Sequence, residues 1–421
     1  MQNQAVSVDE RELQARSMAE DVARRSYGKL VAFLAARTRD VAGAEDALAE
    51  AFVSALADWP RNGCPANPEA WLLTAARRKA IDGYRGQQRH NEAANEIKAM
   101  NDGLEAAEKH SQIPDQRLGL MFACAHPAID AAVRAPLILQ VVLGLDAAAI
   151  GSAFLVSPAA MGKRLVRAKE KIKQAGIPFV IPEREELAAK LDVVLDAIYA
   201  AFAEGWTDPT GGDVARRDLT EESLFLARLV VELLPNSPEA FGLLALMLHA
   251  EARKLARRTA EGEFVPLAEQ DVGLWDSAMI TEAESLLRRA SKFQSPGRYQ
   301  LEAALQSAHV HRLRTGQWNW PDVARLYDAL LSITGSPVVA INRALAIAEV
   351  DGAEAGLRIL EKLSNDPRLA EYQPYWAARA ELFARTDKKE EARKAYEIAI
   401  GLEKDPVVRR FLQKRQSTLE F

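Results

Sequence analysis

Apolar residues recur at intervals of three and four through most of the chain, among positions rich in Ala, Glu, Arg and Lys. This spacing places apolar side chains on one face of an α-helix, whereas the strict alternation typical of strands is rare. The pattern therefore predicts an all-α protein. Near the N-terminus it predicts helices over Asp9–Thr38, Val41–Asp58 and Pro68–Arg89, with a candidate break near Ser26 in the first.

The segment Asp146–Ala175 is the most informative, because its pattern predicts a helix, a tight turn and a second helix. Ile150 lies on the apolar face of the first helix, and the small Gly151 lets a second helix approach closely. Ser157 is suited to cap the next helix, with Pro158 at its first position. This layout is typical of a helix-turn-helix DNA reader.

The second helix of this segment combines an apolar face with a basic one. The inward positions are Met161, Leu165, Ala168 and Ile172. Six cations are expected on the outer arc, against the single Glu170: Lys163, Arg164, Arg167, Lys169, Lys171 and Lys173. A solvated basic helix of an ordinary bundle has a similar composition. The cap, the turn and the two apolar faces that meet there favour DNA binding.

Changes in composition divide the chain into four parts. Residues 1–90 are expected to form a first helical domain, and residues 91–114 are a polar, acidic linker without a strong apolar stripe. Residues 115–182 contain the helix-turn-helix and form a second domain. Residues 183–421 are expected to form a domain of helix pairs.

The last of these parts resembles tetratricopeptide repeats in its placement of large and small residues. The best match is Trp376, Ala380, Phe383, Ala392, Tyr396 and Ala399. Weaker copies lie at Ala340, Ala344, Ile347, Gly356 and Leu360, and at Phe241, Leu244, Ala245 and Leu248, the latter before an insertion around Arg257–Leu274. Such a solenoid offers a concave surface to a protein partner. The alternative is an irregular helical bundle.

Bulk composition narrows the functional classes. The chain has 421 residues, of which 48% are hydrophobic and 27% charged, as is ordinary for a soluble globular protein. Its net charge of −5 restricts attraction to nucleic acid to local basic faces. The polar N-terminus lacks the apolar core of a signal peptide, and no run approaches the roughly 18 apolar residues of a membrane span. We therefore expect a cytoplasmic protein without membrane contact.

The sequence contains no recognisable metal or catalytic constellation. Cys64 and Cys124 are its two cysteines, without a CxxC or a Cys/His cluster. His309 and His311 are two residues apart, which turns them away from each other on a helix. Cys124 and His126 are more typical of a buried thiol beside a helix end than of a nucleophile–base pair. We expect no enzymatic activity, no cofactor and no metal.

A second basic helix is predicted at Trp71–Arg89. It carries five cations against Asp82: Arg77, Arg78, Lys79, Arg85 and Arg89. The nearby aromatic residues Trp59, Trp71 and Tyr84 are of the kind that stacks on unpaired bases, although a core position is the usual one for tryptophan.

The preceding helix has an acidic face. Its inward positions are Ala47, Phe52 and Leu56, and its exposed positions are Glu45, Asp46 and Glu50. An acidic face of this kind either meets a basic partner or is simply solvated, and the sequence alone leaves both interpretations open.

With these segments, the chain resembles a bacterial sigma-70-type RNA polymerase sigma factor of the extracytoplasmic-function (ECF) group. Residues 1–90 resemble sigma region 2 through GAEDALAEAFVSALADWP and NPEAWLLTAARRKAIDGYR. Residues 115–182 resemble region 4 through DQRLGLMFACAHPAI and the helix-turn-helix. Within this group, the chain is similar to the subgroup with a long tetratricopeptide-like C-terminal domain through AFLVSPAAMGKRLVRAKEKIKQAGIPF. The C-terminal domain of that subgroup is resembled by LDVVLDAIYAAFAEGWT, FGLLALMLHAEAR, LWD and INRALAIAE.

The resemblance implies a transcription initiation factor without covalent chemistry of its own, which binds promoter DNA and core RNA polymerase at the β′ clamp helices and β flap. The implied polymerase-binding residues are Glu45, Asp46 and Glu50. Those implied to open and read the −10 element are Trp71, Arg77, Arg78, Lys79, Asp82 and Arg85. Those implied at the −35 element are Ser157, Ala160, Lys163, Arg164, Arg167 and Lys171. The linker would run toward the polymerase active-site channel.

The chain departs from the family pattern at two places in the reader. Ala149-Ile150-Gly151 stands where Glu-Ile-Ala is common, and glycine in a helix costs about 1 kcal/mol relative to alanine. The recognition helix begins with Ala159, Ala160 and Met161, so −35 recognition is expected to depend more on phosphate contacts and DNA shape.

Two other functions compete with this interpretation. One is a helix-turn-helix transcriptional regulator with a repeat-type sensor domain, acting without being a polymerase subunit. The other is a helical hydrolase or transferase, which lacks a catalytic constellation. If the chain is a sigma factor, the C-terminal domain is expected to serve regulation or protein contacts.

Overall fold

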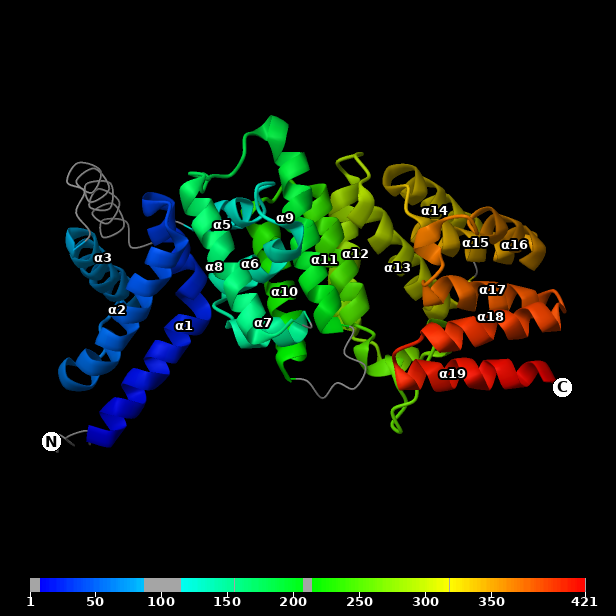
Figure 1. The fold of residues 1–421 in the computed structure, drawn as a ribbon, viewed down its shortest axis with the longest axis horizontal. Coiled ribbons are helices and arrows are strands. Elements are labelled where there is room, and N and C mark those ends of the chain that lie inside the picture. Colours follow the sequence, from blue (N-terminus) through cyan, green and yellow to red (C-terminus); the bar gives the residue numbers. More distant parts are fainter. Residues whose placement is uncertain (1–7, 87–114, 155, 207–213, 318, 421) are drawn as a thin grey trace. The chain divides into compact units, whose positions relative to one another are not determined.

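The computed structural model describes residues 8–86, 115–154, 156–206, 214–317 and 319–420 (Figure 1). These residues form α-helices and short 3-10 helices but no β-strand, apart from an isolated bridge between Arg258 and Phe264. The all-α prediction is therefore confirmed. The chain divides into two compact units, Met1–Gly205 with Val214–Ser223 and Trp206–Asp213 with Leu224–Phe421.

The first unit begins with three helices, α1 (Val8–Thr38), α2 (Val41–Asn62) and α3 (Pro68–Gly86). α1 runs without the break expected near Ser26, whose side chain is buried and donates a hydrogen bond to Glu69 of α3. α2 continues through Pro60 to Asn62. At its end Trp59 is buried, and the carbonyl of Trp59 accepts a 2.9 Å bond from Gly63 N. The loop after α2 is therefore shorter than the sequence suggests.

Four shorter helices follow, α5 (Arg117–Cys124), α6 (Ala131–Leu143), α7 (Ala147–Ala153) and α8 (Pro158–Gln174). Asp130 caps α6 by accepting a bond from Ala132 N, and Gly144 ends it with a left-handed φ of 76°. α9 (Arg184–Trp206) and the first half of α10 (Val214–Leu233) complete the unit. The linker expected at residues 91–114 lies outside the described residues.

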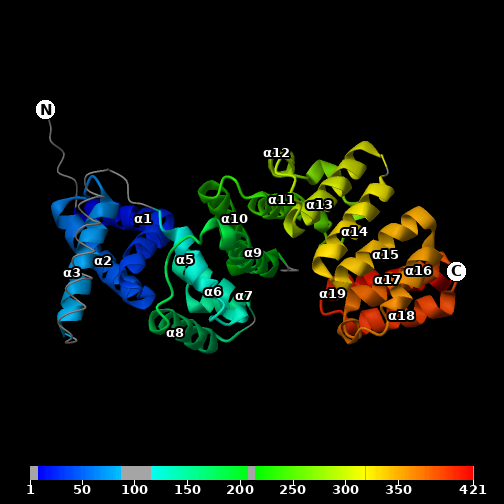
Figure 2. The same cartoon turned by 90° about the horizontal axis from the view of Figure 1, so that it is seen from above.

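α1 joins the two halves of the first unit, because it contacts α2, α3, α5 and α6 (Figure 2). The crossing with α6 is closest at Gly28, where a Cβ atom would lie 1.8 Å from the carbonyl oxygen of Val142. Leu30, Phe33 and Leu137 are almost completely buried in these two helices. The segments expected as separate domains thus pack together, and the unit extends past residue 182 to include α9.

The second unit continues with α11 to α19. Their bounds are α11 Pro238–Glu251, α12 Ser277–Ser291, α13 Arg298–Thr315, α14 Trp320–Thr334, α15 Pro337–Asp351, α16 Ala353–Lys362, α17 Gln373–Arg385, α18 Lys389–Leu402 and α19 Pro406–Ser417. From α11 onward each helix contacts the next along the chain, as in a helical array. In the described part of the protein, no helix has the length and apolar character needed to cross a membrane.

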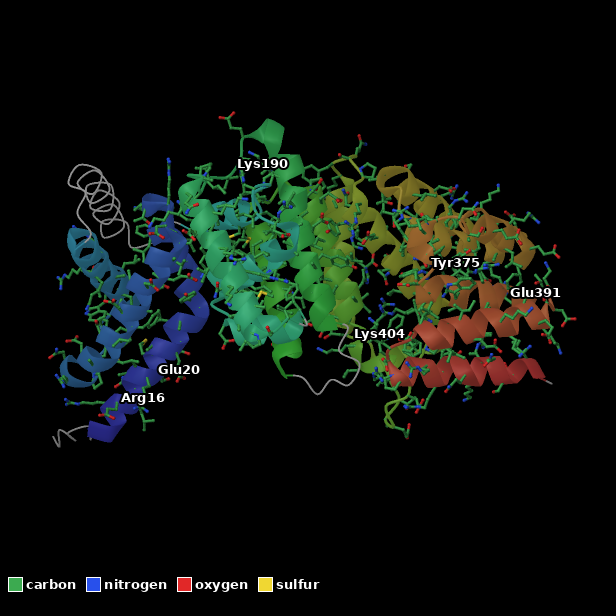
Figure 3. All side chains as sticks on the ribbon, in the orientation of Figure 1. Arg16, Glu20, Lys190, Tyr375, Glu391 and Lys404 are labelled. Carbon is green, nitrogen blue, oxygen red and sulfur yellow. The ribbon has the colours of Figure 1, made fainter. Side chains whose placement is uncertain are left out.

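The small residues singled out in the repeat-like segments are buried where helices meet. Ala344, Ala380, Ala392 and Ala399 have no exposed surface. At Gly356 a Cβ atom would lie 2.7 Å from the carbonyl oxygen of Ala344, so glycine permits α16 to approach α15. Tyr375, labelled in Figure 3, is buried and donates a 3.1 Å hydrogen bond to the carbonyl of Leu360.

The insertion expected around Arg257–Leu274 folds into short turns and 3-10 helices that contact the last helix of the second unit. Arg258 pairs with Asp405 at 3.1 Å, and the rings of Phe264 and Phe411 meet edge to face at 5.4 Å. The insertion therefore ties the beginning of this unit to α19.

Candidate functional site

The local signals of the helix-turn-helix have structural counterparts in α7, the turn and α8. Ser157 Oγ accepts a 3.4 Å hydrogen bond from Ala160 N, and Pro158 is the first residue of α8. Ile150 is completely buried. A Cβ atom at Gly151 would lie 2.7 Å from the carbonyl oxygen of Val156, so the glycine predicted to allow close approach does so at the turn.

α8 presents its expected apolar stripe to the core and most of its cations to solvent. The buried stripe consists of Met161, Leu165, Ala168 and Ile172. Four cations are exposed, namely Lys163, Arg164, Arg167 and Lys171. Ser157 is exposed and Ala160 partly so. The predicted −35 residues are therefore accessible along one helix, while their role at DNA stays a prediction.

Lys169 corrects the expectation of six outward cations. It follows Leu165 by four residues and lies beside the apolar stripe, so that its side chain is 10% exposed. Its ammonium binds Glu45 of α2 at 2.5 Å. Lys173, one turn later, binds Asp40 at 2.6 Å while its own side chain remains 58% exposed.

The acidic face of α2 also differs from the expectation. Asp46 and Glu50 are exposed as predicted, but Glu45 is largely buried by its contact with α8. Burial raises the pKa of Glu45, and the neighbouring Lys169 ammonium opposes that rise. Leu56, expected inward, is 45% exposed, and Val53 is 69% exposed.

These outward residues define a strip on α2, which we call the docking strip: Asp46, Glu50, Val53 and Leu56. A strip that mixes carboxylates with exposed apolar side chains is suited to a protein partner of basic and apolar character. The acidic half was visible in the sequence. The apolar half was missed, because Leu56 fits the inward helical period as well as the outward one.

The first turns of α3 combine packing with basic charge. Trp71 is partly buried and meets Trp59 edge to face at 5.6 Å, so the tryptophans contribute to the core as their type suggests. Arg77 is partly buried, Arg78 is exposed, and Lys79 pairs with Glu50 at 3.4 Å. The side chains of Asp82 and Arg85 lie outside the described part of the chain.

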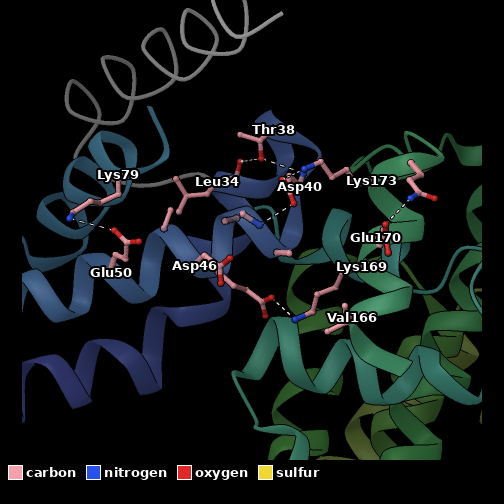
Figure 4. Close-up of a pocket in the computed structure, with 16 residues that line it drawn as sticks. Leu34, Thr38, Asp40, Asp46, Glu50, Lys79, Val166, Lys169, Glu170 and Lys173 are labelled. Carbon is pink, nitrogen blue, oxygen red and sulfur yellow. Dashed lines mark hydrogen bonds and ion pairs between the residues drawn. The ribbon is translucent and has the colours of Figure 1, made fainter. Parts of the chain in front are cut away.

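A groove separates α2 from α8 (Figure 4). Its volume is about 1010 Å³, and its walls include Asp46 and Glu50 from α2, Lys79 from α3, and Val166 and Glu170 from α8. The Lys169–Glu45 and Lys173–Asp40 pairs cross it. Residues of α2, α3 and α8, the three helices predicted to bind polymerase or promoter DNA, therefore line the same groove.

Cys124 lies at the end of α5 and is completely buried. Burial raises the pKa of its thiol, which disfavours a nucleophilic thiolate. His126 instead accepts a 3.1 Å hydrogen bond from Ala128 N through Nδ1. Within the residues that the structure describes, no His, Cys, Asp and Glu side chains gather in a group that would hold a metal ion.

Comparisons with known proteins match two segments of the chain. Residues 22–90 match the model of sigma-70 region 2, and residues 190–291 match a family of unknown function (DUF6596). An uncharacterized protein of Rhizobium meliloti (strain 1021) is 38% identical over 364 residues, which cover 85% of this chain and 86% of that protein. No solved structure matches the chain.

Proposed function

Because this chain belongs to the sigma-70 family of transcription initiation factors, we propose that it is an ECF-type sigma factor that directs core RNA polymerase to specific promoters. The observation that carries the proposal is the match of region 2 to residues 22–90, which span the second half of α1 and all of α2 and α3. The helix-turn-helix of α7 and α8 in the same unit supports a second promoter contact.

The docking strip of α2 is the proposed contact with the β′ clamp helices. Its exposed carboxylates, Asp46 and Glu50, supply charge complementary to a basic partner, and the exposed Val53 supplies apolar area. Charge steers such an encounter and apolar burial stabilises the complex. Glu45 is proposed at the same contact, although in the structure its carboxylate is bound to Lys169.

The DNA contacts are proposed on two helices. α3 would meet the −10 element through Trp71, Arg77, Arg78, Lys79, Asp82 and Arg85. α8 would meet the −35 element through Ser157, Ala160, Lys163, Arg164, Arg167 and Lys171. The short side chains at the start of α8 support recognition that relies on phosphates and groove shape more than on base edges.

Reconstituted transcription tests the proposal. Full-length protein mixed with core RNA polymerase is expected to bind the enzyme and to start transcripts at defined positions on fragments of the source genome. The variant Asp46→Arg/Glu50→Arg should lose polymerase binding, whereas Glu371→Arg, an exposed carboxylate of the second unit, should behave as wild type. A protein that binds promoter DNA but never core polymerase would be the helix-turn-helix regulator instead.

The second unit is proposed as a platform for regulation or protein contacts. Its array of helices from α11 to α19 supports this role, because such arrays present extended surfaces to partners. Photocrosslinkers at the exposed Val350 and Ile398, in the presence of core polymerase, should capture a polymerase subunit if the platform contacts the enzyme. If neither position crosslinks to a polymerase subunit while the protein is bound to the enzyme, a contact at these two positions is excluded.

A further inference from the structure

Polar side chains are buried between α11, α12 and α13 of the second unit, where a helical array is ordinarily apolar. His249 of α11 has no exposed surface, and Arg253, just after α11, is 7% exposed and donates a 2.5 Å hydrogen bond to Gln306 Oε1 of α13. Among the described residues, neither ring nitrogen of His249 has a hydrogen-bond partner. Because buried polar groups are nearly always hydrogen-bonded, this exception requires an explanation.

His249 faces a carboxylate. Its Nε2 atom lies 3.6 Å from Oε1 of Glu284 on α12, and the same oxygen accepts a 2.5 Å hydrogen bond from Ser307 Oγ of α13. Burial and the neighbouring Arg253 lower the pKa of His249 to about 4, so its ring is neutral near pH 7. In the described part of this unit, the carboxylate of Glu284 therefore has no charged cationic side chain bound to it.

Glu284 lines a cleft of about 550 Å³ formed by α12, α13 and α14. Ile280, one turn before Glu284 on α12, and Val310 of α13 are each 3% exposed, and Leu326 of α14 is partly buried. These three side chains give the cleft an aliphatic lining. Its volume lies within the range that is typical of small-molecule sites.

The other charged groups of the cleft do not balance Glu284. Asp322 of α14 already pairs with Arg325 of the same helix. Arg314 follows Ser307 by seven residues, about 10.5 Å along α13, and its side chain is exposed. A negative charge beside the aliphatic lining therefore remains at Glu284, where partial burial strengthens its attraction to a cation.

We propose that this cleft binds a small primary amine, whose ammonium group meets Glu284 and Ser307 and whose aliphatic body lies along the apolar lining. An ammonium has three N–H donors and no acceptor, which suits a carboxylate and a hydroxyl that itself donates to that carboxylate. A small shift of Glu284 toward His249 brings Oε1 within hydrogen-bond distance of Nε2 and supplies the partner that the ring lacks. The inference goes beyond the proposed function, because the cleft lies in the second unit and its occupancy is measured without polymerase.

Saturation-transfer NMR of small probes mixed with the full-length protein tests the proposal. The probes are n-pentylammonium, the uncharged n-pentanol and the anionic n-pentanoate, which share a similar aliphatic body. The wild-type protein should bind n-pentylammonium about tenfold more tightly than n-pentanol, because a hydrogen bond to a charged group contributes at least that factor. It should bind n-pentanoate most weakly of the three. Equal affinities for the three probes, or no binding of n-pentylammonium, overturn the inference.

Three variants locate the site. Glu284→Gln keeps the size of the side chain and should reduce the affinity for n-pentylammonium about tenfold, while the affinity for n-pentanol stays unchanged. Leu326→Trp narrows the cleft from α14 without removing the carboxylate and should weaken binding of both probes. Glu282→Gln is the matched control, because Glu282 is on the same helix but pairs with Arg228 outside the cleft, and it should bind as wild type does. If neither Glu284→Gln nor Leu326→Trp changes the affinity for n-pentylammonium, the amine binds elsewhere and the inference is overturned.

Discussion

Replacing Gly28 with alanine tests whether the helix-turn-helix half of the first unit packs on α1. In the structure the new Cβ would lie 1.8 Å from the carbonyl oxygen of Val142, and real Cβ contacts stay beyond 3.0 Å. The obstructing atoms are the carbonyl oxygen, carbonyl carbon and Cα of Val142, all of them backbone, so α1 and α6 must separate. Overpacking of this severity costs about 3 kcal/mol, whereas alanine in a helix gains about 1 kcal/mol over glycine. The expected net loss is about 2 kcal/mol.

Calorimetry of the full-length protein measures this loss. For a unit of roughly this size, 2 kcal/mol corresponds to a decrease of about 4–8 °C in unfolding temperature. Gly162→Ala in α8 is the matched control, because its Cβ would have Ala147 Cβ at 3.9 Å as its nearest neighbour and should stabilise the same transition. Gly401→Ala, in open space on α18, should raise the transition of the second unit. If Gly28→Ala also stabilises the first unit, α6 does not lie against α1 as the structure has it.

Two further predictions concern charge. If the exposed face of α8 binds phosphates, Lys171→Gln should reduce by about 0.9 the slope of log affinity for promoter DNA against log salt concentration. Arg288→Gln on α12 should leave this slope unchanged. Equal slopes for Lys171→Gln and wild type would exclude a phosphate contact at Lys171. In the second unit, burial and nearby arginines lower the pKa of His249 and of His309 from 6.5 to about 4. Between these pH values the unfolded chain binds protons that the folded unit does not, so the free energy of unfolding should fall as pH decreases from about 6.5 toward 4. His249→Gln should weaken this pH dependence. A pH profile of stability unchanged by that variant would contradict the lowered pKa of His249.

Local signals in the sequence were sufficient for the helix-turn-helix. Ser157, Pro158 and Gly151 contact atoms only a few residues away, so their roles as cap, first helical residue and point of close approach could be predicted from the sequence. The all-α class follows similarly from period and composition. The buried small residues of α15 to α18 were also visible, because helix pairs repeat the same offsets.

Contacts between segments far apart in the sequence could not be predicted from local sequence patterns. Lys169 resembles any solvated lysine until Glu45, 124 positions away, is placed beside it. Similarly, the hydrogen-bond partner of Ser26 in α1 is Glu69 of α3, which is 43 positions away. Changes of composition separated residues 1–90 from 115–182, but an acidic linker in the sequence does not reveal whether the segments that it joins are packed together or apart.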